Sequence, residues 1–367
     1  MMNAKRSIKI LISIYSSLAA VLVVFLGILI YSGNLSKRTA GILLPDDGNF
    51  VEAWNDQLPK FASRLEIPEM TIYTYSNADE LKSYLSQCEK FNILWAEIPI
   101  CGEYNLKEIL KTYDVTSIER KYAQFYPASL FNAILEISGQ KEMKFLPLSY
   151  NPWIMVKRKS VPTKSPFRYS LGAQSESNAL AFITYMRMDE AKTKQIRTTD
   201  EALDQIQKMS SNKVLINNSN TYSEKDAFIA LENGTSSECL MSTSFFSSLS
   251  ISQRENLKFD SMEQTLICDA TVAIFPVRKS EENKERVEKA KNLLITSPNL
   301  VFPTANDRGW MPAIINTSTR SIYTENLRSQ ARLTSKCYIP GMEYSSEEEK
   351  AVLSEKMDRA FRAIYSD

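Results

Sequence analysis

The sequence predicts an α/β protein with two lobes, joined by strands that cross between them and preceded by one N-terminal transmembrane helix. Three observations lead to this prediction. The chain has 367 residues, which is longer than one ordinary hydrophobic core and indicates about two folding units. Strand-like and helix-like segments alternate from residue 39 onward. Finally, an apolar run of membrane-spanning length lies close to the start of the chain.

The apolar run occupies residues 8–31, and basic residues flank it on both sides. A spanning helix needs about 20 apolar residues, whereas the apolar core of a cleaved signal peptide is shorter. Because no small-residue cleavage site closes the run, an uncleaved signal anchor is the favoured interpretation. A cleaved signal peptide and a buried helix remain as alternatives. Either exported form places residues 38–367 outside the cytoplasm, in the cell envelope.

The first part of the exported chain predicts a parallel sheet. Apolar or β-branched runs at 39–45, 70–75 and 91–98 are typical of strands. Between them, apolar residues from Phe50 to Leu65 recur at helical spacing, and Asn77 can cap a second helix. A β-α-β-α-β order of this kind requires right-handed crossovers and neighbouring parallel strands. Ligands of such sheets bind at the carboxyl ends of the strands.

The rest of the chain predicts a second group of elements. Strands are expected at 145–157, 213–216, 238–242 and 270–277, and helices near 176–191, 201–209, 224–232 and 281–295. The capping-box pattern Thr198 to Glu201 marks the start of the 201–209 helix. The strand at 145–157 is long enough to cross between lobes. An amphipathic helix after Ser345 is expected to pack on the body.

Composition excludes several classes of function. Lys and Arg number 44 against 43 for Asp and Glu, so the charge is balanced and a nucleic-acid partner is not expected. The chain contains no histidine, which excludes Ser-His-Asp catalysis and histidine-ligated metals. No glycine-rich phosphate loop is present. Five scattered cysteines form no CxxC pair, although one or two disulfides of unspecified pairing remain open. We therefore expect no cofactor, no metal and no enzymatic activity.

Four stretches occur in an order typical of one family. They are ILWAEI at 93–98, the strand-containing segment 135–159, the segment 226–249, and the segment 270–314 that ends in MPAI. Together they resemble the extracellular solute-binding proteins of ABC importers, in particular the maltose-binding-like class called family 1. The resemblance implies a two-lobed fold of the periplasmic-binding-protein type. It also implies capture of a small solute, carbohydrate-like in this class, and its delivery to an ABC permease.

The sequence departs from that family in four places, one of which is a second lobe, roughly 156–268, that is short for the family. A lipobox cysteine is absent, Ile267-Cys268-Asp269 replaces a glycine-rich turn, and Lys157-Arg158-Lys159 replaces the usual Asn-Lys pair. These departures bear on the ligand more than on the fold. Two other roles therefore stay open, namely a membrane-tethered ligand sensor and an interaction protein that has lost its ligand site.

The resemblance gives expected boundaries. Residues 1–37 form the signal anchor or signal peptide, residues 38–155 with 270–320 form the first lobe, and 156–269 form the second. Residues 321–367 form the C-terminal segment.

Sugar-like ligands need aromatic faces, carboxylates and amides. Candidates for these roles are Asp46, Asp47, Trp95, Glu97, Tyr150, Asn151, Trp153, Phe245, Phe246 and Trp310.

Several candidates also have a plain structural interpretation. Trp95 ends an apolar strand and fits a core position equally well, and one of Phe245 and Phe246 is expected to be buried. Asp46 and Asp47 also fit a solvated turn. By contrast, Tyr150 and Trp153 flank a strand-breaking proline, and Trp310 lies in a loop without periodicity, so the cleft is favoured for these three. Trp54 lies on a helix stripe and is assigned to the core.

Overall fold

The computed structural model describes the body of the chain with short gaps. The described residues are 21–23, 39–100, 104–160, 165–188, 197–216, 219–259, 265–297, 300–301, 305, 309–315, 329–330, 332–341 and 347–362. Most of the expected membrane segment 8–31 lies outside these residues. Within them, no helix combines the length and the apolar character needed to cross a bilayer.

The first lobe is built on a parallel sheet, as predicted. Strand β1 (Thr39–Pro45) pairs in parallel with β2 (Glu69–Tyr75) on one side and with β3 (Ile93–Ile100) on the other. The connections are helical: α2 (Gly48–Asn55) and α3 (Leu58–Arg64) precede β2, and α4 (Ala78–Ser86) precedes β3. The Asn77 side chain accepts a hydrogen bond from the Glu80 amide, which confirms the predicted cap of α4.

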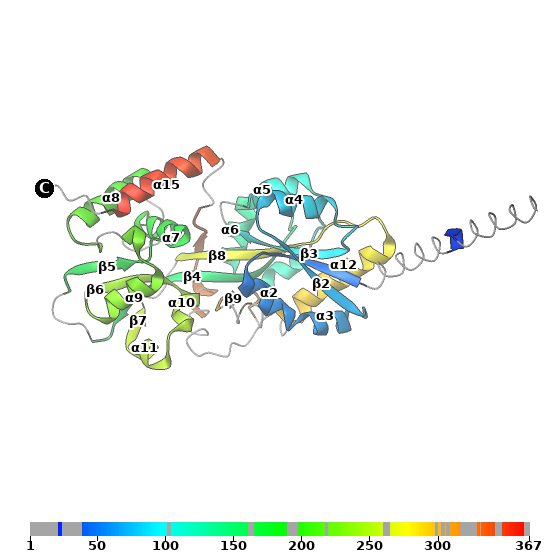
Figure 1. Ribbon diagram of the computed structural model, residues 1–367, viewed down its shortest axis with the longest axis horizontal. Helices are drawn as coiled ribbons and strands as arrows, with labels where there is room; N and C mark the ends of the chain where they lie inside the picture. Colours follow the sequence, from blue (N-terminus) through cyan, green and yellow to red (C-terminus); the bar gives the residue numbers. More distant parts are fainter. Residues whose placement is uncertain are drawn as a thin grey trace, which may run out of the picture.

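Two long antiparallel strands join the lobes. Strand β4 (Leu146–Arg158) and strand β8 (Thr265–Ile274) run side by side across the middle of the molecule (Figure 1). Toward the first lobe β8 pairs with β3, and toward the second lobe β4 pairs with β6 (Ser236–Ser242). The main strand order is therefore β2-β1-β3-β8-β4-β6-β5. The predicted return strand at 270–277 begins earlier and ends at Ile274, shortly before Pro276.

The second lobe surrounds β6 and β5 (Phe167–Leu171), which pair in parallel, and the short β7 (Leu257–Phe259) pairs with β4. Its helices are α7 (Glu176–Met186), α8 (Thr199–Ser211), α9 (Glu224–Glu232), α10 (Thr243–Ser248) and α11 (Ile251–Glu255), with a 3-10 turn, η2, at Ser219–Thr221. The capping box predicted at Thr198 is present and begins α8.

One predicted strand of this lobe is wrong. Residues 213–216 form only an isolated bridge, between Leu215 and Tyr169. The reason is local: α8 ends at Ser211, and Lys213 takes a left-handed conformation with φ of 56°. The chain therefore turns at Lys213, and only residues 214–216 run alongside β5, with hydrogen bonds to Tyr169.

The remaining elements complete both lobes. In the first lobe they are α5 (Leu106–Thr112), the 3-10 helix η1 (Arg120–Phe125), α6 (Ala128–Ser138) and α12 (Glu281–Thr296). The short β9 (Met311–Pro312) pairs with β4, and β10 (Lys336–Tyr338) pairs with β8. The C-terminal α15 (Glu347–Phe361) packs beside α8 on the second lobe (Figure 1).

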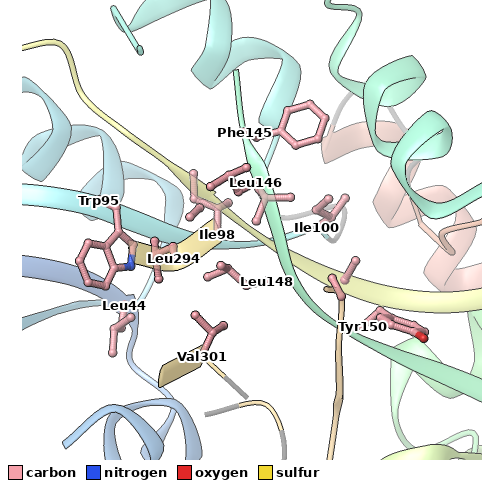
Figure 2. Packing of buried hydrophobic residues seen from close by; sticks show 14 of the residues in the cluster. Leu44, Trp95, Ile98, Ile100, Phe145, Leu146, Leu148, Tyr150, Leu294 and Val301 are labelled. Atoms are coloured by element: carbon pink, nitrogen blue, oxygen red, sulfur yellow. The ribbon is translucent and has the colours of Figure 1, made fainter. Parts of the chain in front are cut away.

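The hydrophobic core consists of two clusters, and the larger one extends from the first lobe into the second, where Phe228, Met241 and Phe246 belong to it. The larger core combines residues of the first three strands with residues of β4, β8 and α12, including Leu44, Trp95, Leu146 and Leu294 (Figure 2). The second core gathers apolar residues of α7 and α8 together with residues of α15 such as Phe361. Because β4 and β8 contribute to both cores, a movement of one lobe against the other must act on these strands.

Candidate functional site

A pocket of about 370 Å³ lies at the carboxyl ends of β1, β2 and β3, which is the edge of the sheet that the sequence predicted. The residues that line it come from the first lobe, from the crossing strand β8, from α7 of the second lobe and from the segment before β9. They are Pro45, Asp46, Asp47, Phe50, Tyr75, Ser76, Pro99, Ile100, Tyr104, Ser177, Asp269, Ala270 and Trp310.

Asp46 and Asp47 form the turn between β1 and α2. The Asp46 amide donates a 2.8 Å hydrogen bond to the Tyr75 carbonyl, which joins the ends of β1 and β2. The Asp46 carboxylate accepts a hydrogen bond of 3.2 Å from the Ser76 hydroxyl. The Asp47 carbonyl accepts from the Phe50 amide at 2.9 Å and so begins α2. Both aspartates are exposed, and the backbone fixes them at the pocket rim.

Aromatic side chains form two contact pairs around the pocket. Phe50 meets the Trp310 ring edge-on, with centroids 6.1 Å apart. Tyr75 and Tyr104 meet at 5.4 Å with their planes nearly perpendicular. The Tyr75 hydroxyl donates a 2.7 Å hydrogen bond to the Glu97 carbonyl, so this ring is fixed at the end of its strand. The aromatic walls therefore hold one another in defined orientations.

Strand β8 and the second lobe supply the remaining polar groups. Asp269 lies opposite Asn151 in the β8–β4 pairing, and Ser177 lies in the first turn of α7. Burial, together with the negative charge of nearby Glu224, raises the pKa of Asp269 to about 8. Burial also raises the pKa of Glu224, although its carboxylate accepts hydrogen bonds from the Ser242 amide and hydroxyl. The site is thus rich in carboxylates at the junction of the lobes.

Three of the ten sequence candidates line this pocket, namely Asp46, Asp47 and Trp310. Asn151 belongs to the adjoining stretch of β4, but its side-chain oxygen accepts hydrogen bonds from the Thr243 hydroxyl and the Ser244 amide. That oxygen therefore helps to fix the start of α10. The other candidates do not belong to the lining residues: Trp95, Glu97, Tyr150, Trp153, Phe245 and Phe246.

Trp95 and Glu97 face the interior of the first lobe. Both are fully buried, with 0% of their surface exposed. Trp95 packs against Trp54 and Phe61 with ring centroids 5.5 Å apart (Trp95 is labelled in Figure 2), and Trp54 lies in the core as assigned. The Glu97 carboxylate accepts a hydrogen bond from the Trp54 indole. We therefore leave Trp95 and Glu97 out of the proposed site.

Tyr150 and Trp153 are also buried, despite the strand-breaking proline between them. The Trp153 indole donates a 2.9 Å hydrogen bond to the Asn178 side chain inside the second core. The strand is not broken, because β4 continues through Pro147 and Pro152 to Arg158. Both side chains therefore belong to the structural framework of the crossing strand.

One of the two neighbouring phenylalanines, Phe245 and Phe246, is buried, as expected. Phe246 is buried against Phe259, with ring centroids 6.0 Å apart. Phe245 is half-buried and meets Phe228 edge-on at the same separation. Neither ring lines the pocket.

Sequence reasoning missed five residues that matter in the pocket: Phe50, Tyr75, Tyr104, Ser177 and Asp269. Signals for two of them were present in the sequence. Tyr75 ends a β-branched strand that points to the ligand edge of the sheet. Asp269 interrupts the apolar run TLICDATVAI, and a charge inside a buried strand is typical of a functional position. Nothing in the sequence indicated that Ser177 would reach the first lobe.

Comparisons with known proteins identify the fold. Neither a family model nor a curated protein matches the sequence. Solved structures do match over nearly the whole chain. The bacterial solute receptor AcbH, described as having an exclusive preference for β-D-galactopyranose, superposes with a TM-score of 0.62 at 12% identity, covering 89% of this chain and 94% of its own.

Two further structures have the same fold. The binding protein msme of Bacillus subtilis, in an open conformation, has a TM-score of 0.63 at 8% identity and covers 88% of this chain and 93% of its own. The spermidine/putrescine substrate-binding protein PotD of Streptococcus pneumoniae has a TM-score of 0.54 at 10% identity, with coverages of 88% and 99%. The chain therefore has the two-lobed α/β fold of the solute-binding proteins of ABC importers.

Proposed function

We propose that the protein captures a small, carbohydrate-like solute outside the cytoplasm and delivers it to an ABC permease. The observation that carries this proposal is the pocket to which the first lobe, the crossing strand β8 and α7 of the second lobe all contribute. A ligand held there touches both lobes, which is what a protein that closes on its ligand requires.

The arrangement of the strands supports closure of this kind. Strand β8 pairs with β3 of the first lobe and with β4, and β4 pairs in turn with β6 of the second lobe, so these two strands connect the lobes. A rotation of one lobe toward the other can be taken up in these strands, and it would bring Ser177 closer to the first-lobe loops. A register shift in the β4–β8 pairing between Pro147 and Ser149 marks a place where this ladder is already irregular.

The chemistry of the lining supports a polar ligand with apolar faces. Tyrosine, tryptophan and phenylalanine rings suit the C–H faces of a sugar, and carboxylates accept hydrogen bonds from its hydroxyl groups. The preference of AcbH for β-D-galactopyranose shows that a protein of this fold can bind a single sugar.

The proposal includes a tether. Residues 8–31 would anchor the protein at the membrane and hold the binding lobes beside the permease at high effective concentration. The same arrangement would place the binding lobes in the cell envelope.

Thermal unfolding of the full-length protein in mild detergent tests the binding proposal. A panel of monosaccharides and short oligosaccharides is added at increasing concentrations. A ligand at 100 times its Kd should stabilise the fold by about 2.7 kcal/mol. The Ser177→Phe variant should abolish the shift by filling the pocket, whereas Ser252→Phe in an exposed first turn of α11 should not. A folded protein that no small solute stabilises would contradict the proposal.

A further inference from the structure

The charges around the pocket are of one sign. Asp46, Asp47 and Asp269 line it, and Glu224 lies close enough to Asp269 to raise its pKa. Among the described residues that line the pocket, none is a lysine or an arginine. This contrasts with the chain as a whole, in which basic and acidic residues are balanced at 44 and 43. The side chains at the pocket that can carry a charge are therefore all acidic, an excess that the composition does not impose.

Asp269 is the most informative of these groups. Its carboxylate lies on β8 at the junction of the lobes, and the described residues offer it neither a hydrogen bond nor an ion pair. A partly buried carboxyl group without a partner loses hydration without compensation. Its only strong electrostatic neighbour in the described part of the chain is another carboxylate, Glu224. The ionised form of Asp269 is therefore costly in the free protein, and a bound cation stabilises it.

The occupant is not expected to be a metal ion. Within the described ranges, no group of three or more Cys, Asp or Glu side chains converges closely enough to hold one. Calcium, the hard cation most suited to carboxylates, takes six to eight oxygen ligands. The carboxylates here are instead spread over β8 and the β1–α2 turn, around a cavity of about 370 Å³. That size suits an organic cation.

The aromatic residues fit the same type of ligand. The same cavity is lined by four aromatic residues, Phe50, Tyr75, Tyr104 and Trp310. An ammonium group is attracted to the face of an aromatic ring as well as to a carboxylate. The aliphatic part of an amine-bearing solute also gains from contact with these rings.

We propose that the solute captured in this pocket carries a protonated amine, which Asp269 binds with Asp46 and Asp47 beside it. This inference rests on the proposed function, because it specifies the ligand of the same site. An amino sugar and a polyamine share the required chemistry, namely a primary ammonium on a small polar or aliphatic frame.

Binding by isothermal titration calorimetry tests the inference on the full-length protein in mild detergent at pH 7.5. The first arm compares galactosamine with galactose and N-acetylgalactosamine, and glucosamine with glucose and N-acetylglucosamine. Within each set only the group at one carbon changes. The second arm uses putrescine and spermidine, and glucuronate and calcium chloride serve as an anionic and a metal control.

We expect at least one amine to bind ten-fold or more tightly than every neutral probe. Tight binding of galactosamine or glucosamine identifies an amino sugar, and tight binding in the second arm alone identifies a polyamine. Equal or tighter binding of galactose, glucose, glucuronate or calcium would overturn the inference while leaving solute capture intact. Failure of every probe, with neutral oligosaccharides included, would overturn both the inference and the proposed function.

Substitutions of equal size separate charge from shape. Asp269→Asn and Asp46→Asn should each weaken the amine by ten-fold or more and leave any neutral analogue within two-fold. Asp204→Asn, at an exposed position of α8, should change neither. An unchanged amine affinity in Asp269→Asn, with the fold verified by circular dichroism, would remove Asp269 from the site and overturn the proposal.

Proton release gives an independent readout. At pH 7 the Asp269 carboxyl is mostly protonated in the free protein, because its pKa is about 8. An ammonium bound beside it favours the ionised form, so binding should release protons at pH 7 and progressively fewer above pH 9. The groups that face Asp269 or share its cavity are Glu224, Asp46, Asp47, Tyr75 and Tyr104. Calorimetry in buffers of different ionisation enthalpy measures the number of protons released. Asp269→Asn should abolish this proton release. Proton release that persists in the variant would contradict the assignment of Asp269 as the group that binds the amine.

Discussion

The indole nitrogen of Trp54 donates a 2.8 Å hydrogen bond to the carboxylate of Glu97, deep in the first lobe. The second oxygen of the same carboxylate accepts a hydrogen bond of 2.9 Å from the Thr271 hydroxyl on β8. That hydroxyl also lies 2.8 Å from the Ser149 hydroxyl on β4. A buried polar chain thus links α2 and β3 to both strands that cross between the lobes, just beside the pocket.

Thr271→Val tests the strength of this chain. The substitution keeps the shape of the side chain and removes the hydroxyl between Glu97 and Ser149. Hydrogen bonds to charged groups contribute about 1.5–3 kcal/mol, and we expect the free energy of unfolding to fall by that amount. Urea denaturation at pH 7 measures it. The control is Thr71→Val on the less buried strand β2, which should change the free energy of unfolding by no more than about 0.5 kcal/mol. An equal loss in both variants would show that the loss in Thr271→Val does not come from the hydrogen-bond network.

Trp310 and Trp153 should behave in opposite ways. Trp310 is half-buried at the pocket, so Trp310→Ala should weaken ligand binding roughly 5- to 30-fold with a nearly unchanged melting temperature. Trp153 is 5% exposed and belongs to the second core, so Trp153→Ala should cost about 3–5 kcal/mol of stability. Calorimetric titration and thermal unfolding measure the two effects. A large stability loss in Trp310→Ala would mark that residue as structural.

Asp269 should make stability depend on pH in a direction unusual for a carboxylate. Its pKa is raised to about 8 in the folded protein, while the unfolded value is near 4. The folded state therefore binds more protons between these pH values, and its stability falls as pH rises from about 4 to about 8. Asp269→Asn removes this penalty, and the variant should exceed the parent by more than about 1 kcal/mol at pH 8.

The control for this effect is Asp204→Asn, an exposed substitution on α8. Urea denaturation at pH 5 and at pH 8 should give the parent and this control the same pH dependence. An Asp269→Asn variant that gains nothing between the two pH values would show that the Asp269 carboxyl titrates in its ordinary range.

Cys268 and Cys337 are expected to form a disulfide under oxidising conditions. Their sulfur atoms lie 3.5 Å apart, on the paired strands β8 and β10, and both are free thiols in the structure. Burial raises the pKa of the Cys268 thiol, so little thiolate is present and the reaction should be slow without a thiol–disulfide oxidoreductase. Once formed, the bond should stabilise the fold by about 2–4 kcal/mol.

Mass spectrometry after alkylation under denaturing conditions checks this pairing. Oxidised protein should lack alkylation at both Cys268 and Cys337, and Cys337→Ser should restore it at Cys268. Cys239→Ser, at a buried cysteine on β6, should leave the pairing unchanged. A crosslink that involves other cysteines, or none, would contradict the prediction.

Much of the fold could be predicted from the sequence, because its signals are local. The strands of the first lobe, the caps at Asn77 and Thr198, and the helix at 224–232 follow from periodicity and capping. Strand β5 was missed, although the alternation of apolar and polar residues in FRYSL is typical of a strand. The 213–216 strand was over-predicted because the left-handed turn at Lys213 leaves little trace in composition.

The site was less predictable for a physical reason. An aromatic residue at a strand end faces either the pocket or the core, and a shift of one residue exchanges the two faces. Trp95, Glu97 and Tyr75 are all buried, yet only Tyr75, at the carboxyl end of β2, is among the residues that line the pocket. Asp269 and Ser177 reach the pocket only through the pairing of β8 and the placement of the second lobe. Long-range pairing of that kind has no signature in a single sequence.

The pairing of β3 with β8 has a consequence for folding during synthesis of the chain. Ala96 and Ile274, which are neighbours in the sheet, are separated in the chain by all the strands of the second lobe. Until the ribosome has delivered β8, the edge of β3 stays open, and folding that depends on such distant contacts is slow. Under the proposed export, this delay keeps the nascent chain unfolded for longer, which would help it to pass through a translocation channel.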